Sequence, residues 1–208
     1  DRLLTMVRYP SGIGGEGFFQ KDVGGRVPEW VGRAEVEKES GRITHVVCNT
    51  RPTLVYLANL ACISAHVTLS RIDRLHNPDQ MIFDLDPPDS DFTPVRKAAK
   101  KLRAFLTDIG LECFLKTTGS KGLHVMVPLD RAADFDAVRA FARHISKRLA
   151  EIYPQELDNR RLDSRKYNIR NIFRRLAQAG DPWAHARAKA FSISGPQARL
   201  NEILVESA

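Results

Sequence analysis

Two carboxylates two positions apart are the strongest chemical signal in the sequence. Asp84 and Asp86 follow the apolar run 81–83, which is typical of a buried strand. Because alternate residues of a strand point to the same face, both carboxylates are expected to lie together. Such a pair of hard oxygen ligands suits Mg²⁺ or Mn²⁺, and in nucleotidyl transfer it can hold two metal ions. An ordinary solvated strand end is the alternative, but the apolar strand before the pair and Pro87-Pro88 after it favour a functional site.

The segment 116–124, Lys-Thr-Thr-Gly-Ser-Lys-Gly-Leu-His, is a second candidate. Its small residues let backbone amides approach a phosphate, and Lys121 adds positive charge. Thr118, Ser120 and His124 can donate hydrogen bonds to phosphate oxygens or sugar. The segment lacks the spacing of a Walker A loop, and a plain hairpin turn is the competing interpretation. Its position after the helix that follows the two carboxylates predicts one shared site.

Four more residues are candidates for nucleotide or nucleic-acid contacts. His66, at the start of a strand shortly before the carboxylate strand, could reach a triphosphate or a ribose. Lys21 follows a Gly-rich loop and could contact phosphate, while Phe18 and Phe19 offer a stacking surface for a base. The alternative for His66 is a purely structural histidine. For the other three residues, the alternative is a pair of core aromatic residues beside a surface lysine.

A basic helix is predicted over 169–177, and Arg174 and Arg175 on it could follow a nucleic-acid backbone. Taken alone, such a feature is more often just a solvated face.

The composition is compatible with a polyanionic partner but does not require one. The 208 residues contain 32 Lys and Arg against 25 Asp and Glu, and 43% are hydrophobic, enough for one good core or two small ones. Solubility alone could explain the net charge of +7. Cys48, Cys62 and Cys113 have no metal-site spacing and are expected to be reduced thiols. With no membrane-spanning run and no signal peptide, a cytoplasmic protein without a membrane partner is expected.

Hydrophobic periodicity predicts strands alternating with helices, hence an α/β fold with a mixed sheet. The strands are expected at 3–8, 18–21, 43–48, 65–69, 81–84, 113–117 and 123–128, and the helices at 53–62, 94–109 and 135–153.

Five segments, read together and in order, resemble the polymerase domain of bacterial ligase D, a member of the archaeo-eukaryotic primase superfamily. They are Phe18-Phe-Gln-Lys21, Leu57-Ala-Asn-Leu60, His66, Phe83-Asp-Leu-Asp-Pro87 and Thr117-Thr-Gly-Ser-Lys-Gly-Leu-His124. The segments Arg174-Arg-Leu-Ala177 and Asp181-Pro-Trp183 resemble the end of that domain. The resemblance implies a primase-polymerase-like fold in which helices flank a central sheet.

The function implied by this resemblance is template-directed nucleotidyl transfer. Such a polymerase would fill or extend DNA ends in non-homologous end joining, with a preference for ribonucleoside triphosphates and for Mn²⁺ over Mg²⁺. Its implied partners are DNA ends with a template strand, a Ku-type end-binding protein, and a DNA ligase domain, fused or separate. We therefore expect a nucleoid-associated protein in the cytoplasm.

The resemblance also implies roles for individual residues. Asp84 and Asp86 would be the catalytic metal ligands, and Phe18 and Phe19 would face the template or the base pair. The incoming triphosphate would be contacted by Lys21, His66, Thr118, Ser120 and Lys121.

Two features of the family pattern are absent. The family's N-terminal helical segment does not precede Asp1, and no third metal-binding aspartate stands in the expected apolar-Asp-x-x-Arg-Asn setting. Asp158 and Asp163 do not match that motif and are not assigned the role. We expect residues 1–208 to form a single catalytic domain, truncated at its N-terminus and lacking a segment near 156–160, with a helical tail over 167–208.

Two other functions fit parts of the sequence. The first is a catalytically weakened DNA-end or nucleotide-binding module of the same fold, which the missing third carboxylate favours. The second is a haloacid-dehalogenase-type phosphatase, because Ile82-Phe-Asp-Leu-Asp86 resembles its nucleophile motif. Against the phosphatase, Pro88 stands where that motif has Thr or Val, and no later acidic pair follows on an apolar strand.

Overall fold

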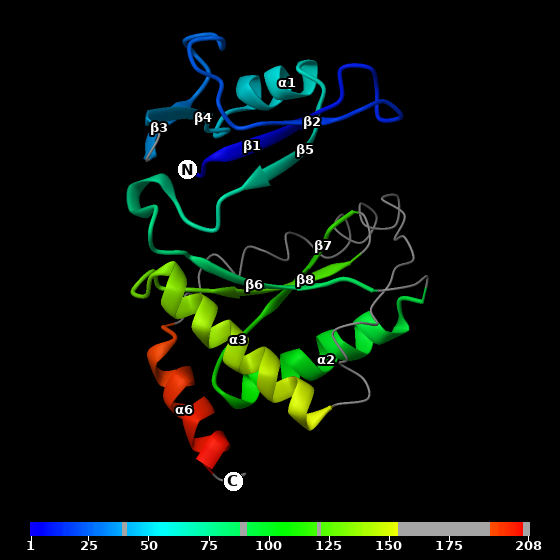
Figure 1. Cartoon of the computed structure of the whole chain (residues 1–208), viewed down its shortest axis with the longest axis vertical. Coiled ribbons are helices and arrows are strands. Elements are labelled where there is room, and N and C mark those ends of the chain that lie inside the picture. The colour runs from blue at the N-terminus through cyan, green and yellow to red at the C-terminus, as the bar shows by residue number, and fades with distance from the viewer. Residues whose placement is uncertain (39–40, 88–90, 120–121, 154–191, 206–208) are drawn as a thin grey trace. The chain divides into compact units, whose positions relative to one another are not determined.

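The computed structural model describes residues 1–38, 41–87, 91–119, 122–153 and 192–205. They belong to two compact units, Asp1–His76 and Asn77–Ala208, which are described separately below (Figure 1). That the two units act as one catalytic domain stays a prediction.

The first unit is a five-stranded sheet with one helix. The strands run in the order β2-β1-β4-β3, β5 pairs with β1, and every pairing is antiparallel. The elements are β1 (Leu4–Arg8), β2 (Phe18–Gln20), β3 (Arg33–Lys38), β4 (Gly41–Val46), α1 (Arg51–Asn59), β5 (Cys62–Val67) and the short 3₁₀ helix η1 (Ile72–Arg74).

Helix α1 begins where its sequence predicts a helix start. The Thr50 side chain accepts a hydrogen bond from the Thr53 backbone amide at 3.3 Å, and a proline occupies the first turn. Leu57 of α1 belongs to a buried cluster with Leu4 and Met6 of β1. The even-numbered residues of β1 therefore face the helix, and the odd-numbered residues point to the opposite face of the sheet.

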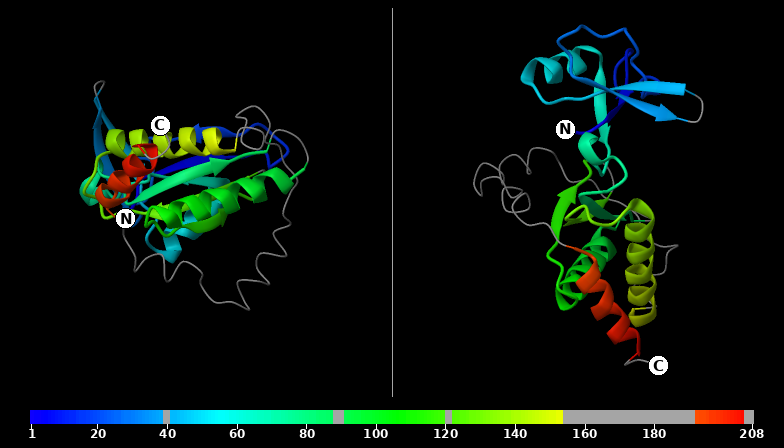
Figure 2. Two further views of the ribbon diagram at one scale, coloured as in Figure 1. Left: turned by 90° about the horizontal axis from the view of Figure 1, so that it is seen from below. Right: turned by 90° about the vertical axis from the view of Figure 1, so that its left-hand side faces the viewer.

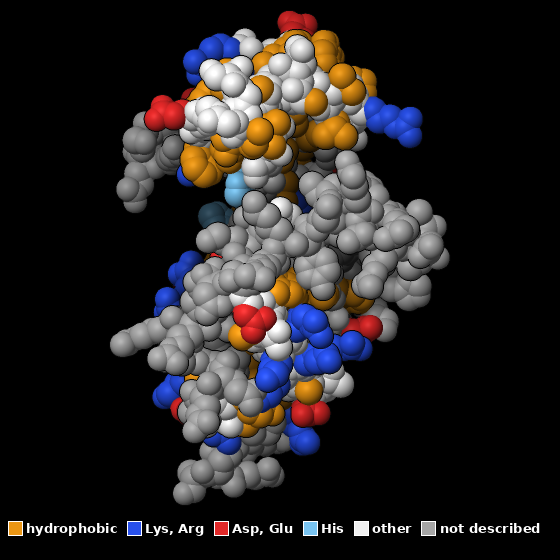
Figure 3. Space-filling model, turned by 90° about the vertical axis from the view of Figure 1, so that its right-hand side faces the viewer, with side chains coloured by type: hydrophobic (Ala, Val, Ile, Leu, Met, Phe, Trp, Pro, Cys, Tyr) orange, Lys and Arg blue, Asp and Glu red, His pale blue; other side chains and the backbone are white. Residues whose placement is uncertain are grey.

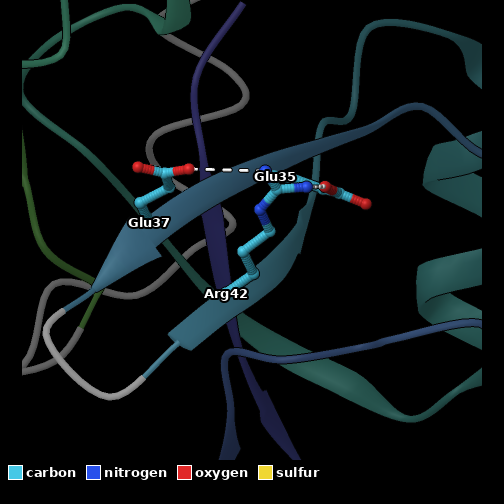
Figure 4. A network of polar contacts seen from close by, with 3 residues as sticks. All are labelled: Glu35, Glu37 and Arg42. Carbon is cyan, nitrogen blue, oxygen red and sulfur yellow. Dashed lines mark hydrogen bonds and ion pairs between the residues drawn. The ribbon is translucent and has the colours of Figure 1, made fainter.

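Two features of this unit differ from the sequence prediction. Strand β3 was not predicted, because four of its six residues are charged, as is common for edge strands. Across the β3–β4 hairpin, Arg42 lies 3.4 Å from both Glu35 and Glu37 (Figure 4). The helix predicted to reach residue 62 ends at Asn59, because Ala61 turns the chain with a φ of 55° and β5 starts directly after it.

The second unit is a three-stranded antiparallel sheet covered by helices. The strands run in the order β6-β8-β7. Its elements are β6 (Gln80–Leu85), α2 (Thr93–Asp108), β7 (Phe114–Thr117), β8 (Leu123–Pro128), α3 (Phe135–Ile152) and α6 (Ser194–Val205).

Helices α2 and α3 lie on one face of this sheet (Figures 1 and 2). The odd-numbered strand residues, such as Phe83 of β6 and Val125 of β8, are buried against apolar residues of both helices. The even-numbered strand residues consequently point to the face away from α2 and α3. Asp134 caps α3 by accepting a hydrogen bond from the Ala137 amide at 2.8 Å, and Gly110, with a φ of 84°, follows the end of α2.

The predicted α/β class is confirmed, with antiparallel strands that form two sheets. Helix α6 lies inside the tail predicted to be helical, and the rest of that tail before residue 192 is outside the described residues. In the part of the chain that the structure describes, no helix is both long and apolar enough to cross a membrane.

Candidate functional site

A row of polar side chains crosses the sheet of the second unit on the face away from its helices. The β6–β8 register pairs Asp84 with His124, and the β8–β7 register pairs His124 with Lys116. His124 Nε2 lies 3.3 Å from Asp84 Oδ1, and the two side chains are 24% and 60% exposed. An anion, a cation and an imidazole thus share one open surface.

The neighbouring row on the same face is apolar. Two positions along each strand from the polar row, Met126 of β8 is paired with Ile82 of β6 and with Phe114 of β7. They are half-buried or buried. The polar row therefore borders an apolar surface.

Asp86 is held close to the loop between β7 and β8. A methyl group at Gly122 would collide with Asp86 Oδ1 and with the Leu85 carbonyl oxygen. Only glycine lets the loop backbone approach the second carboxylate this closely. The strand end and the loop that were predicted to share a site are thus in contact.

The Thr118 hydroxyl holds this loop closed. Its Oγ1 accepts a hydrogen bond from the Gly122 amide at 3.2 Å and donates one to the Gly122 carbonyl oxygen at 3.3 Å. Gly119, with a φ of 78°, makes the turn between them. Thr118, predicted to contact a nucleotide, thus shapes the loop here, while Ser120 and Lys121 lie outside the described residues.

His124 directs one ring nitrogen at a carboxylate, and its other ring nitrogen is buried. Its Nδ1 is buried and has no hydrogen-bond partner among the described residues. Its Nε2 is the nitrogen directed at Asp84. The predicted hydrogen bond from His124 to a nucleotide stays a prediction, and the structure adds a contact that can orient the Asp84 carboxylate.

The oxygen atoms of Asp84 and Asp86 are ligands of the kind that divalent cations such as Mg²⁺ and Mn²⁺ prefer. Asp84 is open to solvent, and among the described residues His124 is the only partner with which either carboxylate forms an ion pair. The described residues contain no group of three or more His, Cys, Asp and Glu side chains that could hold a metal ion. Asp84 and Asp86 would therefore supply two ligands and leave other positions to water and substrate. Asp158 and Asp163 lie outside the described residues.

The first unit brings together two of its predicted site residues. Phe19 of β2 and His66 of β5 flank the central strand β1, opposite Val7 and Thr5. Both therefore lie on the face away from α1, with their ring centroids 5.9 Å apart. Phe19 is 68% exposed, so most of its ring is free to contact a base.

Phe18 points the other way. It is paired with Arg8, whose guanidinium lies 5.4 Å from the centre of the Phe18 ring. Neighbouring residues of a strand face opposite sides, so Phe18 and Phe19 do not form one stacking surface. Lys21 is exposed directly after β2, and Arg174 and Arg175 lie outside the described residues.

Lys116 is a candidate that the sequence analysis did not select. It begins the segment 116–124 and joins the polar row only because the turn pairs it with His124. Lys116 and His124 lie equally far in sequence from the middle of the turn. This spacing indicates that they are paired only once the register of the hairpin is known.

Comparison with known proteins identifies the family. The family described as LigD, primase-polymerase domain, matches residues 1–163. The chain belongs to this family. Residues 1–163 span the first unit and the described strands and helices of the second up to α3, so the predicted resemblance is confirmed.

Curated relatives agree with this assignment. The chain is 34% identical over 157 residues to the multifunctional non-homologous end joining protein LigD of Mycolicibacterium smegmatis, covering 74% of this chain and 21% of that protein. It is 30% identical over 164 residues to the bifunctional non-homologous end joining protein LigD of Bacillus subtilis, covering 78% of this chain and 26% of that protein. The chain thus spans about a fifth to a quarter of these relatives.

The fold agrees with a solved LigD structure. The polymerase domain of Mycobacterium tuberculosis ligase D in complex with DNA superposes with a TM-score of 0.76 at 23% identity. The match covers 91% of this chain and 86% of that one.

Proposed function

We propose that this LigD-family chain transfers nucleotides from nucleoside triphosphates to DNA ends under the direction of a template strand. The observation that carries the proposal is the arrangement at the end of β6. Asp84 is in contact with His124, and Asp86 lies against Gly122 of the adjacent loop. Two partly exposed carboxylates beside a glycine-containing loop suit a metal-bound triphosphate.

The context of the reaction comes from the relatives. The curated relatives are named as non-homologous end joining proteins, and the structural neighbour was solved with DNA. We infer that the chain acts on broken DNA ends during end joining, together with a DNA ligase domain and a Ku-type end-binding protein. The preferences for ribonucleotides and for Mn²⁺ belong to the same proposal.

Asp84 and Asp86 would hold Mn²⁺ or Mg²⁺. When bound, the metal would neutralise charge on the attacking and leaving oxygens. His124 would keep the Asp84 carboxylate in one orientation. Lys116, on the same face, would place a positive charge where the phosphates of the incoming nucleotide arrive.

The remaining roles concern positioning of the substrate. The exposed ring of Phe19 would stack on a base, and His66 beside it would contact the ribose or the triphosphate. Lys21 would contact phosphate. The loop closed by Thr118 would present its backbone, together with Ser120 and Lys121, to the triphosphate.

A DNA-end or nucleotide-binding module without efficient catalysis is the second candidate. The observation that favours it is that the described residues contain no group of three or more His, Cys, Asp and Glu side chains placed to hold a metal ion. Such a module would bind duplex ends with a steep salt dependence. Its binding would not depend on Asp84 or Asp86.

Extension of a primer in a short gapped duplex tests the proposal. The reaction contains Mn²⁺ and either ribonucleoside or deoxyribonucleoside triphosphates, and the added base must match the template. Templated extension confirms the proposal, and comparing the two nucleotide types tests the ribonucleotide preference. DNA binding without extension supports the binding module instead. Hydrolysis of a phosphate monoester with Mg²⁺, without extension, would support the phosphatase.

A further inference from the structure

A groove lies between α2 and the strands on the helix-covered face of the second unit's sheet. Its volume is about 230 Å³, and its apolar lining includes Leu115 of β7 and Leu123 and Val125 of β8. Leu115 is 55% exposed, which is unusual for a leucine that borders a core. The groove is therefore open to solvent and has an apolar floor.

Three cations of α2 line the same groove, namely Arg96, Lys100 and Arg103. Spacings of four and three residues place them on one side of the helix. At a rise of 1.5 Å per residue, the row is about 10 Å long. None of the three forms an ion pair with another described residue. The row consequently has positive charge that no described carboxylate neutralises.

Cys113 lines the groove together with Arg103. Burial raises the pKa of the Cys113 thiol, whereas the Arg103 charge lowers that pKa and Glu112 raises it. Glu112 is the acidic residue next to Cys113 in the chain, and it does not line the groove. Lys and Arg side chains also gather beside hydrophobic ones on the surface of this unit around α2 (Figure 3).

The groove is separate from the candidate catalytic row. Leu115 and Lys116 are neighbours in β7, so they point to opposite faces of the sheet. Lys116 joins Asp84 and His124 on the face away from the helices, while Leu115 lines the groove beside α2. A ligand in the groove would leave the carboxylates free.

We propose that this groove binds a short stretch of single-stranded nucleic acid. The phosphates lie along Arg96, Lys100 and Arg103, and a base lies on the apolar floor at Leu115. Three cations in a row can contact successive phosphates of one strand. A single strand fits better than a duplex, because its bases are free to contact an apolar surface. It fits better than an acidic peptide, whose carboxylates bring no flat apolar group.

This inference rests on the proposed function only in taking nucleic acid as the partner. It adds a second contact on the other face of the sheet, which would hold an unpaired strand near the site without taking part in the chemistry.

Binding of a fluorescent oligothymidylate to the full chain, without metal or triphosphate, tests the groove. The test variant is Arg96→Gln/Lys100→Gln/Arg103→Gln, and the control Lys97→Gln/Arg143→Gln/Lys147→Gln removes the same charge at exposed positions outside the groove. Losing three phosphate contacts should reduce the slope of log K against log salt by about 2, since each contributes about 0.7 for single strands. Affinity should fall at least about tenfold, whereas the control should change the slope by less than half as much.

A further variant separates the apolar floor from the charge. Leu115→Ser should weaken binding and leave the salt slope unchanged. Equal slopes for the test and control variants would overturn the proposal. So would equally tight binding of a duplex, or equally effective competition by polyglutamate. Extension of the gapped duplex is measured on the same variants. If only the catalytic proposal is wrong, the chain does not extend the primer but still shows groove-dependent binding. If only the groove proposal is wrong, the chain extends the primer, and the test and control variants bind the oligothymidylate with equal salt slopes.

Discussion

His124 lies directly opposite Asp84 across the β6–β8 pair, with its Nε2 3.3 Å from Asp84 Oδ1. If Asp84 holds a metal ion, His124 is the partner that fixes the orientation of its carboxylate. Loss of such a partner typically weakens metal binding by about 10- to 100-fold. We predict a weakening of this size for His124→Ala, measured by Mn²⁺ titration. His144→Ala, on the exposed side of α3, is the control and should bind Mn²⁺ normally.

Gly122→Ala should disturb the second carboxylate. The added methyl group would meet Asp86 Oδ1 and the Leu85 carbonyl oxygen, and the backbone oxygen cannot move without shifting the strand end. We predict at least a tenfold loss of extension rate. Gly25→Ala is a suitable comparison, because nothing lies within 4 Å of a methyl group there. Equal rates for the two variants would show that the loop does not position Asp86.

Phe18 and Phe19 should differ in their effect on DNA binding. Phe19→Ala removes an exposed ring beside His66, and base stacking on an aromatic side chain is worth about 1–3 kcal/mol. Phe18→Ala removes a ring that lies against Arg8 on the other face. Affinity for a gapped duplex, measured by fluorescence anisotropy, should fall clearly only for Phe19→Ala. A larger loss for Phe18→Ala would contradict the face assignment.

Cys113 should react slowly with alkylating agents. Its raised pKa keeps the thiol protonated, and the thiolate is the reactive form. Iodoacetamide labelling of a Cys48→Ser/Cys62→Ser variant should be slower than labelling of the unfolded chain at pH 8 and should accelerate at higher pH. Arg103→Gln removes a charge that lowers this pKa, so labelling should slow further. A faster rate would show that Arg103 mainly shields the thiol.

The same thiol sets the direction of a pH effect on stability. The Cys113 thiol keeps its proton to higher pH in the folded state than in the unfolded state. The folded state therefore binds more protons than the unfolded state once the pH rises through the pKa of an unfolded cysteine, about 8.5. The contribution to the free energy of unfolding is therefore fully present below that pH and is lost above it. Denaturant unfolding of Cys113→Ser should show a smaller decline between pH 8 and pH 10.

Local patterns predicted most of the elements that carry the site. The apolar spacing of α2 and α3 placed both helices to within one residue of their observed ends, and the run before Asp84 gave β6. Strand β3 was missed because its alternating charges form an edge pairing with β4 that only tertiary structure reveals. Adjacent residues of the predicted strand 18–21 must face opposite sides, but that Phe19 is the one beside His66 depends on the pairings of β1 with β2 and β5.

The same limit applies to the candidate site. Asp84 and Asp86 were selected as candidates from their spacing alone, and their role stays a prediction. Lys116 became a candidate only through the hairpin register that aligns it with His124. The role of Gly122 depends on a close approach of two backbone segments, for which the sequence shows only a glycine.

Single-turnover extension of a gapped duplex by Asp84→Asn/Asp86→Asn tests the central claim most directly. The control is Asp108→Asn/Asp136→Asn, which changes the charge equally at exposed positions. We predict that the first variant binds DNA but loses at least about a hundredfold in rate with Mn²⁺, as expected when charge in the transition state is no longer stabilised. The control should keep most of the rate. Equal rates for the two variants would contradict a metal-dependent reaction at Asp84 and Asp86.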